Sequence, residues 1–73
     1  MKDMSESYEP KYLVNVSADR NANKFYRMIP DSTGLGFTVE YGRIGAPTFR
    51  TAHYPIEKWY DKYYEKTAKG YVD

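Results

Sequence analysis

The sequence predicts an α+β fold: a small antiparallel β-sheet of about four to five strands, with one amphipathic C-terminal helix packed across it. Residues 11–17 alternate apolar and polar side chains, and residues 37–44 place Phe, Val and Tyr at alternate positions, as half-buried strands do. From residue 56 onward, apolar residues recur at the spacing of an amphipathic helix. With 73 residues, the chain has room for one small domain.

The N-terminal part divides into three expected segments. Residues 1–10 are polar and unpatterned up to Pro10, which predicts a flexible leader before a domain of residues 11–73. Residues 11–17 are expected to form the first strand, with Tyr12, Val14 and Val16 on one face and Leu13, Asn15 and Ser17 on the other. Residues 18–23 are rich in turn-forming and charged residues, so we expect a loop.

The middle of the chain predicts a β-hairpin. Residues 24–29 are rich in strand-forming side chains, and residues 37–44 form the third strand, with Phe37, Val39 and Tyr41 on one face. Between them, Asp31 caps a turn in which Gly34 supplies a positive φ. The short connection makes the two strands antiparallel neighbours.

A short edge strand and a helix complete the expected fold. Residues 48–53 form the edge strand, and Pro55 suits the first position of a helix because its missing N–H group costs nothing there. Gly70 is expected to stop this helix. We expect its core-facing stripe to comprise Ile56, Trp59, Tyr60, Tyr63, Tyr64 and Thr67. We expect its solvent face to comprise Lys58, Asp61, Lys62, Glu65, Lys66 and Lys69.

Composition excludes several function classes. The chain has no Cys and its only His is His53, so a disulfide framework, a thiolate metal site and a two-His zinc site within one chain are excluded. No carboxylates or nucleophile stand in a catalytic context, so we expect no enzyme activity, no cofactor and no metal. Apolar runs are too short to span a membrane, and a secretory signal layout is absent, so we expect an intracellular protein, cytoplasmic if bacterial.

Charge is distributed unevenly along the chain. Residues 20–71 carry four Arg and five Lys against five acidic residues, a net charge of +4, whereas residues 1–19 carry −2. A modestly basic domain permits a nucleic-acid partner. Four cations lie on or beside predicted strands, and together they would form a phosphate-binding patch, although each could also be an ordinary surface charge. These residues are Lys24, Arg27, Arg43 and Arg50.

The sharpest local motif is Tyr41-Gly42-Arg43-Ile44-Gly45. Its two glycines permit a tight turn that leaves an aromatic ring beside an Arg. The ring can stack on a sugar or base, and the Arg fork can bind a phosphate. The alternative interpretation is a strand end with a bulge, in which Tyr41 is a core residue and Arg43 is solvated. The shared face of Tyr41 with Phe37 and Val39 favours that alternative.

The order of these pieces resembles the WGR domain, a family named for a Trp-Gly-Arg strand motif that is usually extended to Trp-Gly-Arg-Ile-Gly. The matching segments are Asn23–Tyr26, Tyr41–Gly45 and the ending Glu65–Tyr71, which is similar to the family's Lys-Thr-x-x-Gly-Tyr. The resemblance covers roughly residues 11–73. It implies an antiparallel sheet with a helix packed across it, in agreement with the pattern analysis.

The resemblance also implies a site. In DNA-dependent poly(ADP-ribose) polymerases, the WGR domain binds the end or nick of a DNA duplex. The motif aromatic packs on the sugar at the break, and the motif Arg relays binding to neighbouring domains. Tyr41 takes the place of the Trp and Arg43 that of the Arg, while Asn23 and Lys24 match a segment near the bound backbone. The expected nucleic-acid-binding residues are therefore Tyr41, Gly42, Arg43, Asn23, Lys24, Arg27 and Arg50.

The sequence departs from the family pattern at two places. Tyr41 replaces the Trp with a smaller ring, and residues 46–48 are Ala-Pro-Thr where the family often has Gly and Gln. The first hypothesis is therefore a non-catalytic nucleic-acid-binding module that recognises DNA ends or nicks, with RNA as an open alternative. The second hypothesis is a protein–protein interaction module that uses the same face. The edge strand at 48–53 leaves pairing with a second copy open.

Overall fold

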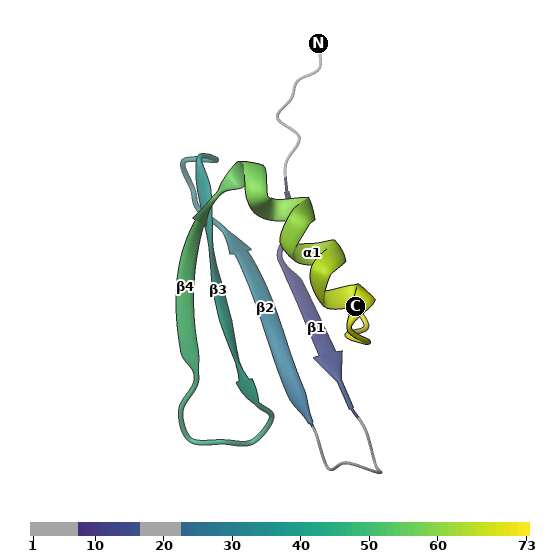
Figure 1. Cartoon of the computed structure of the whole chain (residues 1–73). Coiled ribbons are helices and arrows are strands. Elements are labelled where there is room, and N and C mark those ends of the chain that lie inside the picture. Colours follow the sequence, from purple (N-terminus) through teal and green to yellow (C-terminus); the bar gives the residue numbers. More distant parts are fainter. Residues whose placement is uncertain (1–7, 17–22) are drawn as a thin grey trace.

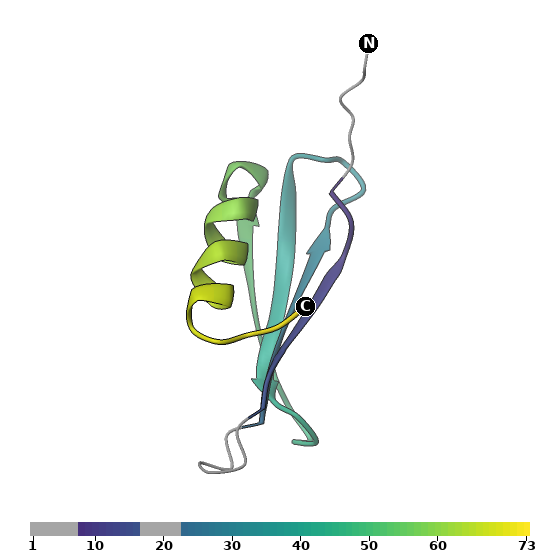
Figure 2. The ribbon, with the colours of Figure 1, turned by 90° about the vertical axis from the view of Figure 1, so that its right-hand side faces the viewer.

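The computed structural model describes residues 8–16 and 23–73. One antiparallel sheet has the strand order β1-β2-β3-β4, and a short 3₁₀ helix, η1, leads into the α-helix α1. Helix α1 lies across one face of the sheet (Figures 1 and 2). The predicted α+β class with a single C-terminal helix is confirmed. The elements are β1 Lys11–Asn15, β2 Lys24–Pro30, β3 Gly36–Arg43, β4 Arg50–Pro55, η1 Ile56–Lys58 and α1 Trp59–Ala68.

Strands β2 and β3 form the predicted hairpin. The backbone N–H of Asp31 donates to the carbonyl of Gly36 over 2.9 Å, and that of Gly34 donates to the carbonyl of Asp31 over 3.1 Å. Gly34 has φ +78°, a left-handed conformation that favours glycine. The positive φ predicted at Gly34 is confirmed. Asp31 closes the turn through its backbone N–H and carbonyl, while its carboxylate lies 2.9 Å from His53 Nε2.

Several predicted boundaries were wrong by one or two residues. Strand β1 ends at Asn15, two residues before the predicted end at Ser17, which lies outside the described residues together with residues 18–22 of the predicted loop. Strand β4 spans Arg50–Pro55, so it begins and ends two residues after the predicted strand of residues 48–53. Pro55 does not open an α-helix: it ends β4 with an extended backbone (φ −67°, ψ 154°) and precedes η1. An edge strand tolerates proline because a missing N–H there need not break the ladder.

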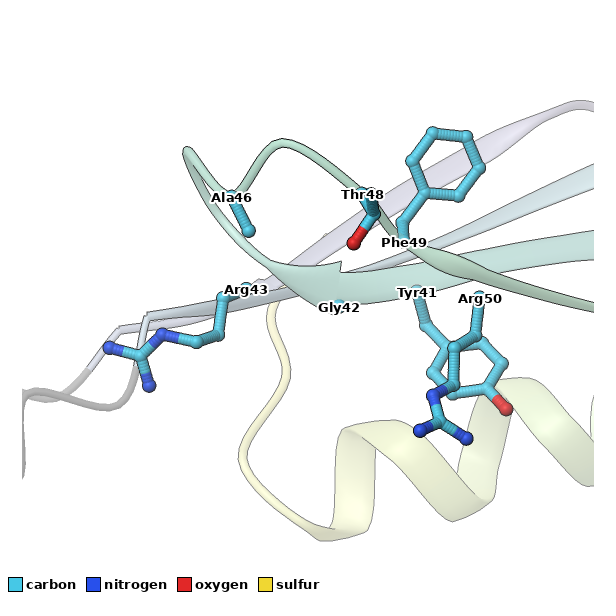
Figure 3. Close-up of a pocket in the computed structure, with 7 residues that line it drawn as sticks. All are labelled: Tyr41, Gly42, Arg43, Ala46, Thr48, Phe49 and Arg50. Carbon is cyan, nitrogen blue, oxygen red and sulfur yellow. The ribbon is translucent and has the colours of Figure 1, made fainter.

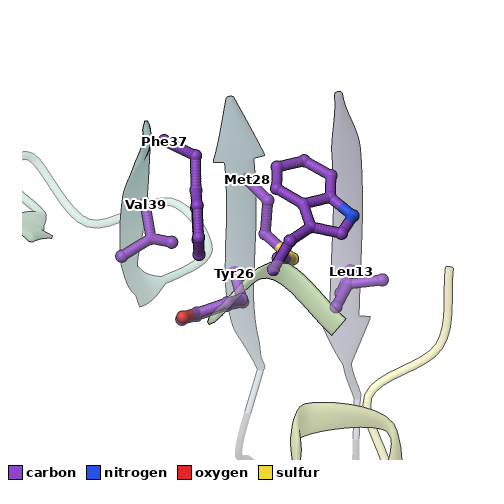
Figure 4. Packing of buried hydrophobic residues seen from close by; sticks show 6 residues of the cluster. Leu13, Tyr26, Met28, Phe37 and Val39 are labelled. Carbon is purple, nitrogen blue, oxygen red and sulfur yellow. The ribbon is translucent and has the colours of Figure 1, made fainter. Parts of the chain in front are cut away.

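The core lies between the sheet and α1. Alternate residues of β1, β2 and β3 project to the helix side, which follows from the two-residue period of a strand (Figure 4). The indole of Trp59 meets the ring of Phe37 edge-on, with ring centroids 5.0 Å apart at an interplanar angle of 75°. The buried core residues are Leu13, Tyr26, Met28, Phe37, Val39 and Trp59.

Helix α1 docks in a different rotation from the one predicted. Tyr60 and Tyr64 were expected in the core but are 54% and 60% exposed. Lys62 and Lys66 were expected on a solvent face, yet the ammonium nitrogen of each stands 4.6 Å from the centroid of a sheet tyrosine ring. Long lysine stems can cover apolar surface while the charged end stays near water, and an ammonium over a ring is attracted to its face. The helix therefore presents lysines as well as aromatics to the sheet.

Segments outside the helix and strands close the two margins of the core. Tyr8 packs against Trp59 and Tyr60, with ring centroids 5.3 and 5.9 Å apart, while residues 1–7 of the predicted leader lie outside the described residues. Val72 pairs with Val14 through two backbone hydrogen bonds of 2.9 and 2.7 Å, so the C-terminal segment continues the sheet beside β1. Strand β4 forms the opposite edge of the sheet, as predicted. Within residues 8–16 and 23–73, no helix combines the length and apolarity needed to cross a membrane.

Candidate nucleic-acid interface

The predicted motif lies at the end of β3 and in the turn that follows it. The backbone N–H of Ile44 donates to the carbonyl of Asn23 over 2.9 Å, and the N–H of Ala46 donates to the carbonyl of Arg43 over 3.2 Å. Gly45 has φ +88°, so the turn needs a residue that adopts a left-handed backbone without a steric cost. The second glycine of the motif is therefore explained by backbone geometry.

The first glycine of the motif makes room for a neighbouring side chain. A Cβ atom at Gly42 would lie 3.3 Å from the Cβ of Phe49 and 3.5 Å from its Cα. Phe49 immediately precedes β4, so the absence of a side chain at Gly42 lets this segment lie close to the end of β3. The two glycines together form a compact β3–β4 connection around the motif.

Tyr41 is half-buried at the margin of the core. Its ring lies 6.1 Å from that of Tyr26, centroid to centroid, and its direct cross-strand partner on β4 is Arg50. The packing favoured by the alternative interpretation is therefore real, but it leaves part of the ring accessible. A ring held in place by a core neighbour and partly open to solvent can act as a stacking platform.

Three of the four predicted cations come together on the helix side of the sheet. Lys24 on β2 lies directly opposite Arg43 on β3, and Arg50 stands opposite Tyr41. In Figure 3, the side chains of Tyr41 and Arg50 leave the same side of the sheet. Like charges directly opposite each other on two strands are destabilising. The register of β2 and β3 therefore places two positive charges side by side at this end of the sheet.

Arg27, the fourth predicted cation, lies on the other face. Its cross-strand partner is Glu40, and its guanidinium Nη1 lies 3.0 Å from the Glu40 carboxylate. The pair is a hydrogen-bonded ion pair on the face that α1 does not cover. Arg27 is thus separated from the other three cations by the thickness of the sheet. Asn23, which directly precedes Lys24, stays with the motif through its carbonyl bond to Ile44.

Lys66 is a candidate residue that the sequence reasoning missed. Its ammonium nitrogen lies 4.6 Å from the ring centroid of Tyr26 and 5.6 Å from that of Tyr71. Burial lowers the pKa of Lys66; the charge of Lys69 lowers this pKa further, and the carboxylate of Glu65 partly opposes the shift. The ending that resembles the family pattern contains both Lys66 and Tyr71, so that match could have drawn attention to this lysine.

A cavity of about 310 Å³ opens beside the motif (Figure 3). Among the described residues, Tyr41, Arg43 and Arg50 line it, and no acidic residue does. The side chains of Tyr41 and Arg50 extend together, whereas the Arg43 side chain extends away from them along the end of β3 (Figure 3). A planar guanidinium binds phosphate through paired hydrogen bonds, and an aromatic ring offers a face to a sugar or base. The lining residues are Tyr41, Gly42, Arg43, Ala46, Thr48, Phe49 and Arg50.

Comparison with protein families places these features in context. The WGR domain family matches residues 9–73, which is nearly the whole chain. The chain belongs to the WGR domain family. No curated protein and no solved structure matches it. WGR is a small binding domain that is not catalytic itself, and the family is associated with nucleic-acid binding.

The described residues of this WGR domain do not meet the requirements of a metal site. In the part of the chain that the structure describes, no three His, Asp or Glu side chains come together as a metal site would need. The closest such arrangement is a pair, in which His53 Nε2 lies 2.9 Å from a carboxylate oxygen of Asp31. This pair sits beside Gly36, at the opposite end of β3 from the motif.

Proposed function

We propose that this WGR domain is a non-catalytic module that binds the ends or nicks of DNA through the cavity beside its motif. The observation that carries the proposal is the direct opposition of Lys24 and Arg43 in the sheet register. A phosphate backbone bound beside this pair would be attracted by both positive charges and would offset the repulsion between them.

The cavity supports a division of labour between stacking and charge. Tyr41 would pack on the sugar or base face that a strand break exposes, because the neighbouring Tyr26 ring holds it at the cavity wall. Arg43 and Arg50 would bind phosphate oxygens through their planar forks. Lys24 would add a point charge to the same backbone. An intact duplex presents phosphates but covers its base faces, so the stacking contact favours a break.

The same face also includes two residues at its border. Lys66 projects from α1 toward the sheet with its pKa lowered, so a nearby phosphate would stabilise its charged form. Asn23 adjoins Lys24 and carries a side-chain amide that can donate to a phosphate oxygen. Arg27 is left out of the proposed surface because it is paired with Glu40 on the other face. The proposed set of binding residues therefore leaves out Arg27, which was predicted to belong to it, and adds Lys66, which was not.

The test is fluorescence anisotropy with a labelled, 5′-phosphorylated nicked duplex and an intact duplex of the same sequence, at about 50 and about 200 mM salt. We expect tighter binding to the nick, and we expect the Tyr41→Ala/Arg43→Ala variant to lose that preference. Lys24→Gln should weaken binding and reduce the salt dependence by about one phosphate contact. Arg27→Gln is the matched control, because it removes one positive charge from the same strand on the opposite face.

Two results would contradict the proposal. If the folded wild-type domain does not bind either duplex at low salt, the cavity is not a DNA site, and a protein partner becomes the better hypothesis. If Lys24→Gln and Arg27→Gln weaken binding equally, attraction follows total charge rather than the proposed surface. A protein partner docking on this face would instead give an affinity that changes little with salt.

A further inference from the structure

The face of the sheet opposite α1 carries a row of aromatic side chains. Tyr12 on β1, Phe25 on β2 and Phe49 before β4 form this aromatic row, and Figure 2 shows α1 on the other side of the sheet only. Tyr12 and Phe49 are each 52% exposed, and Phe25 lies half-buried between them. Large aromatics left exposed together on one face indicate a contact surface rather than part of the core.

The spacing of the row fits separated bases better than a duplex. The ring centroids of Tyr12 and Phe25 are 6.0 Å apart, with planes 25° from parallel, and those of Phe25 and Phe49 are 6.2 Å apart. Bases within a duplex strand are stacked about 3.4 Å apart, so neighbouring rings of this row cannot each meet a neighbouring paired base. Unpaired bases can be splayed apart, and aromatics on the exposed face of a four-stranded sheet are suited to stacking them.

The row is continuous with the cavity beside the motif. Phe49 lines that cavity together with Tyr41 and Arg43, yet Figure 3 shows its ring on the opposite side of the sheet from Tyr41. The close approach of Phe49 to Gly42 connects the two surfaces at the sheet margin. A strand that leaves the cavity can therefore pass directly onto the row.

Charge at this margin suits a phosphate backbone. Lys24 and Arg50 are the chain neighbours of Phe25 and Phe49, and their side chains leave the helix side of the sheet, so the two cations lie across the sheet margin from the row. In the described strands, the first carboxylate along β3 from the motif is that of Glu40, which is already paired with Arg27. Among the described strands, a nucleic-acid strand crossing the margin would thus meet these cations before it meets an acidic side chain other than that of Glu40.

We propose that the aromatic row binds unpaired nucleotides that continue from the DNA end held in the cavity. The inference rests on the proposed function and names the kind of end: a break with a short single-stranded flap or overhang. Tyr12 and Phe25 stack successive splayed bases, and Phe49 guides the strand from the cavity onto the row. Base stacking on aromatic rings is tolerant of sequence, so the row selects for single-strandedness and not for a particular base.

The experiment compares three nicked duplexes in anisotropy: a flush nick, a nick with a 5′ flap of about four unpaired nucleotides, and the same flap with abasic residues. The abasic flap keeps every phosphate and removes the bases. We expect the ordinary flap to bind about fivefold or more tighter than the flush nick, and the abasic flap to lose most of that gain. Tyr12→Ala should remove the gain while leaving flush-nick binding unchanged, because Tyr12 does not line the cavity.

Matched variants separate stacking from folding. Tyr12→Trp keeps a stacking surface at the same position and should retain the gain. Tyr64→Ala removes a ring on α1 that is 60% exposed, compared with 52% for Tyr12, and should leave every affinity unchanged. Circular dichroism of each variant checks that the sheet is intact.

The remaining outcomes would overturn either the inference about the aromatic row or the proposed function itself. Equal affinities for the flap and the flush nick would overturn the inference while the proposed function stands. Equal gains from the ordinary and abasic flaps would also overturn it, because phosphates alone would then explain the effect. If no substrate binds, the proposed function itself fails. If sedimentation shows a dimer of the wild type that Tyr12→Ala dissociates, the row is an interface between two copies and not a nucleic-acid surface.

Discussion

The positive charges of β2 have opposite cross-strand partners on the two faces of the sheet. The side chain of Lys24 lies on the helix side, which α1 covers, and that of Arg27 lies on the bare side, which α1 does not cover. Arg27 meets Glu40 directly across the strand and forms an ion pair of 3.0 Å, whereas Lys24 meets Arg43, a like charge. The difference teaches that, in a small sheet, the strand register decides whether a cation faces a carboxylate or another cation. The net charge of +1 would not reveal it.

Aromatic side chains divide between the faces in the same manner. On the helix side, Tyr26, Phe37 and Trp59 are buried, while on the bare side Tyr12 and Phe49 stay half-exposed. A thin core has room for only some of the nine tyrosines and three phenylalanines of this chain. The aromatic side chains that the core does not hold remain at the surface, where they can pack against one another or contact a ligand.

The largest expected effect tests the helix side. Trp59→Ala removes the single buried residue of α1 and should cost about 3–5 kcal/mol, because it leaves a large cavity against Phe37. A domain of this length has a total stability of a few kcal/mol, on the order of 0.05–0.15 kcal/mol per residue. We therefore expect the variant to be largely unfolded at room temperature, as measured by urea titration followed by circular dichroism.

The matched control for Trp59→Ala lies on the other side of the same helix. Tyr64 is 60% exposed, so Tyr64→Ala should cost less than about 1 kcal/mol. Similar losses for the two variants would mean that α1 does not dock on the sheet through Trp59. That outcome would mean that the side of α1 that carries Trp59 contributes no more to stability than the side that carries Tyr64.

The next effect tests the bare side at the far end of β3. A Cβ atom at Gly36 would lie 2.8 Å from the His53 ring and 2.9 Å from the backbone oxygen of Tyr54. Because a backbone oxygen in a strand cannot move away easily, Gly36→Ala should cost about 1–3 kcal/mol. It should also disturb the contact between His53 and Asp31. Urea titration measures the cost, and the NMR signals of the His53 ring report the contact.

Gly42→Ala sharpens the same test near the motif. Its Cβ would meet the side chain of Phe49 at 3.3 Å, a contact that a small shift of the loop can relieve. We expect a smaller loss of stability than for Gly36→Ala. A larger loss would show that the β3–β4 connection is as rigid as the paired strands.

A pH effect follows from the burial of Tyr26. Burial raises the pKa of the Tyr26 hydroxyl well above its ordinary value of 10.0, and the neighbouring Tyr54 and Glu65 raise this pKa further. The folded state therefore holds a proton that the unfolded state loses above pH 10. The contribution to stability is complete below pH 10 and falls by up to about 1.4 kcal/mol for each pH unit above it.

Tyr26→Phe checks this linkage. The variant has no proton to hold, so its stability should decline less steeply than that of the wild type as the pH rises above 10. Circular dichroism across an alkaline titration measures the two slopes. Tyr64→Phe makes the same chemical change at an exposed position and serves as the control. Parallel slopes for wild type and Tyr26→Phe would show that Tyr26 does not contribute.

Much of the fold could be predicted from the sequence, because local patterns determine it. Each local pattern predicts one local element. Alternation at Phe37 and Val39 indicates a strand, the positions of Asp31 and Gly34 indicate a turn, and the apolar spacing after Ile56 indicates a helix. The rotation of α1 could not be predicted in this way. Tyrosine and lysine are both amphipathic, so a stripe of tyrosines flanked by lysines does not show which flank the sheet will cover.

The candidate site was predictable to a similar degree. The strand period alone separates Lys24 from Arg27, because an odd spacing of three residues places them on opposite faces. The opposition of Lys24 and Arg43 depends on the register between two strands, which follows from the full hairpin rather than from either segment. The position of Lys66 depends on helix docking, which no local pattern describes. Residues from one strand were thus easier to assign than residues brought together from several elements.

The smallest expected effect returns to the two faces of β2. Lys24→Gln removes one of two opposed cations and should stabilise the fold by about 0.2–1 kcal/mol. Arg27→Gln breaks the partly exposed ion pair with Glu40 and should destabilise the fold by a similar amount. Urea titrations at low salt measure both changes, and added salt should reduce them because exposed charges are screened.

The value of this last pair lies in the opposite signs. Each of the two substitutions removes one positive charge from β2, but Lys24 lies opposite a cation on one face of the sheet and Arg27 lies opposite a carboxylate on the other. If Lys24→Gln gains stability while it loses DNA affinity, the lysine stabilises the complex at the expense of the free fold. If both variants lose stability, Lys24 has a structural role, and the register argument for a binding surface on the helix side fails.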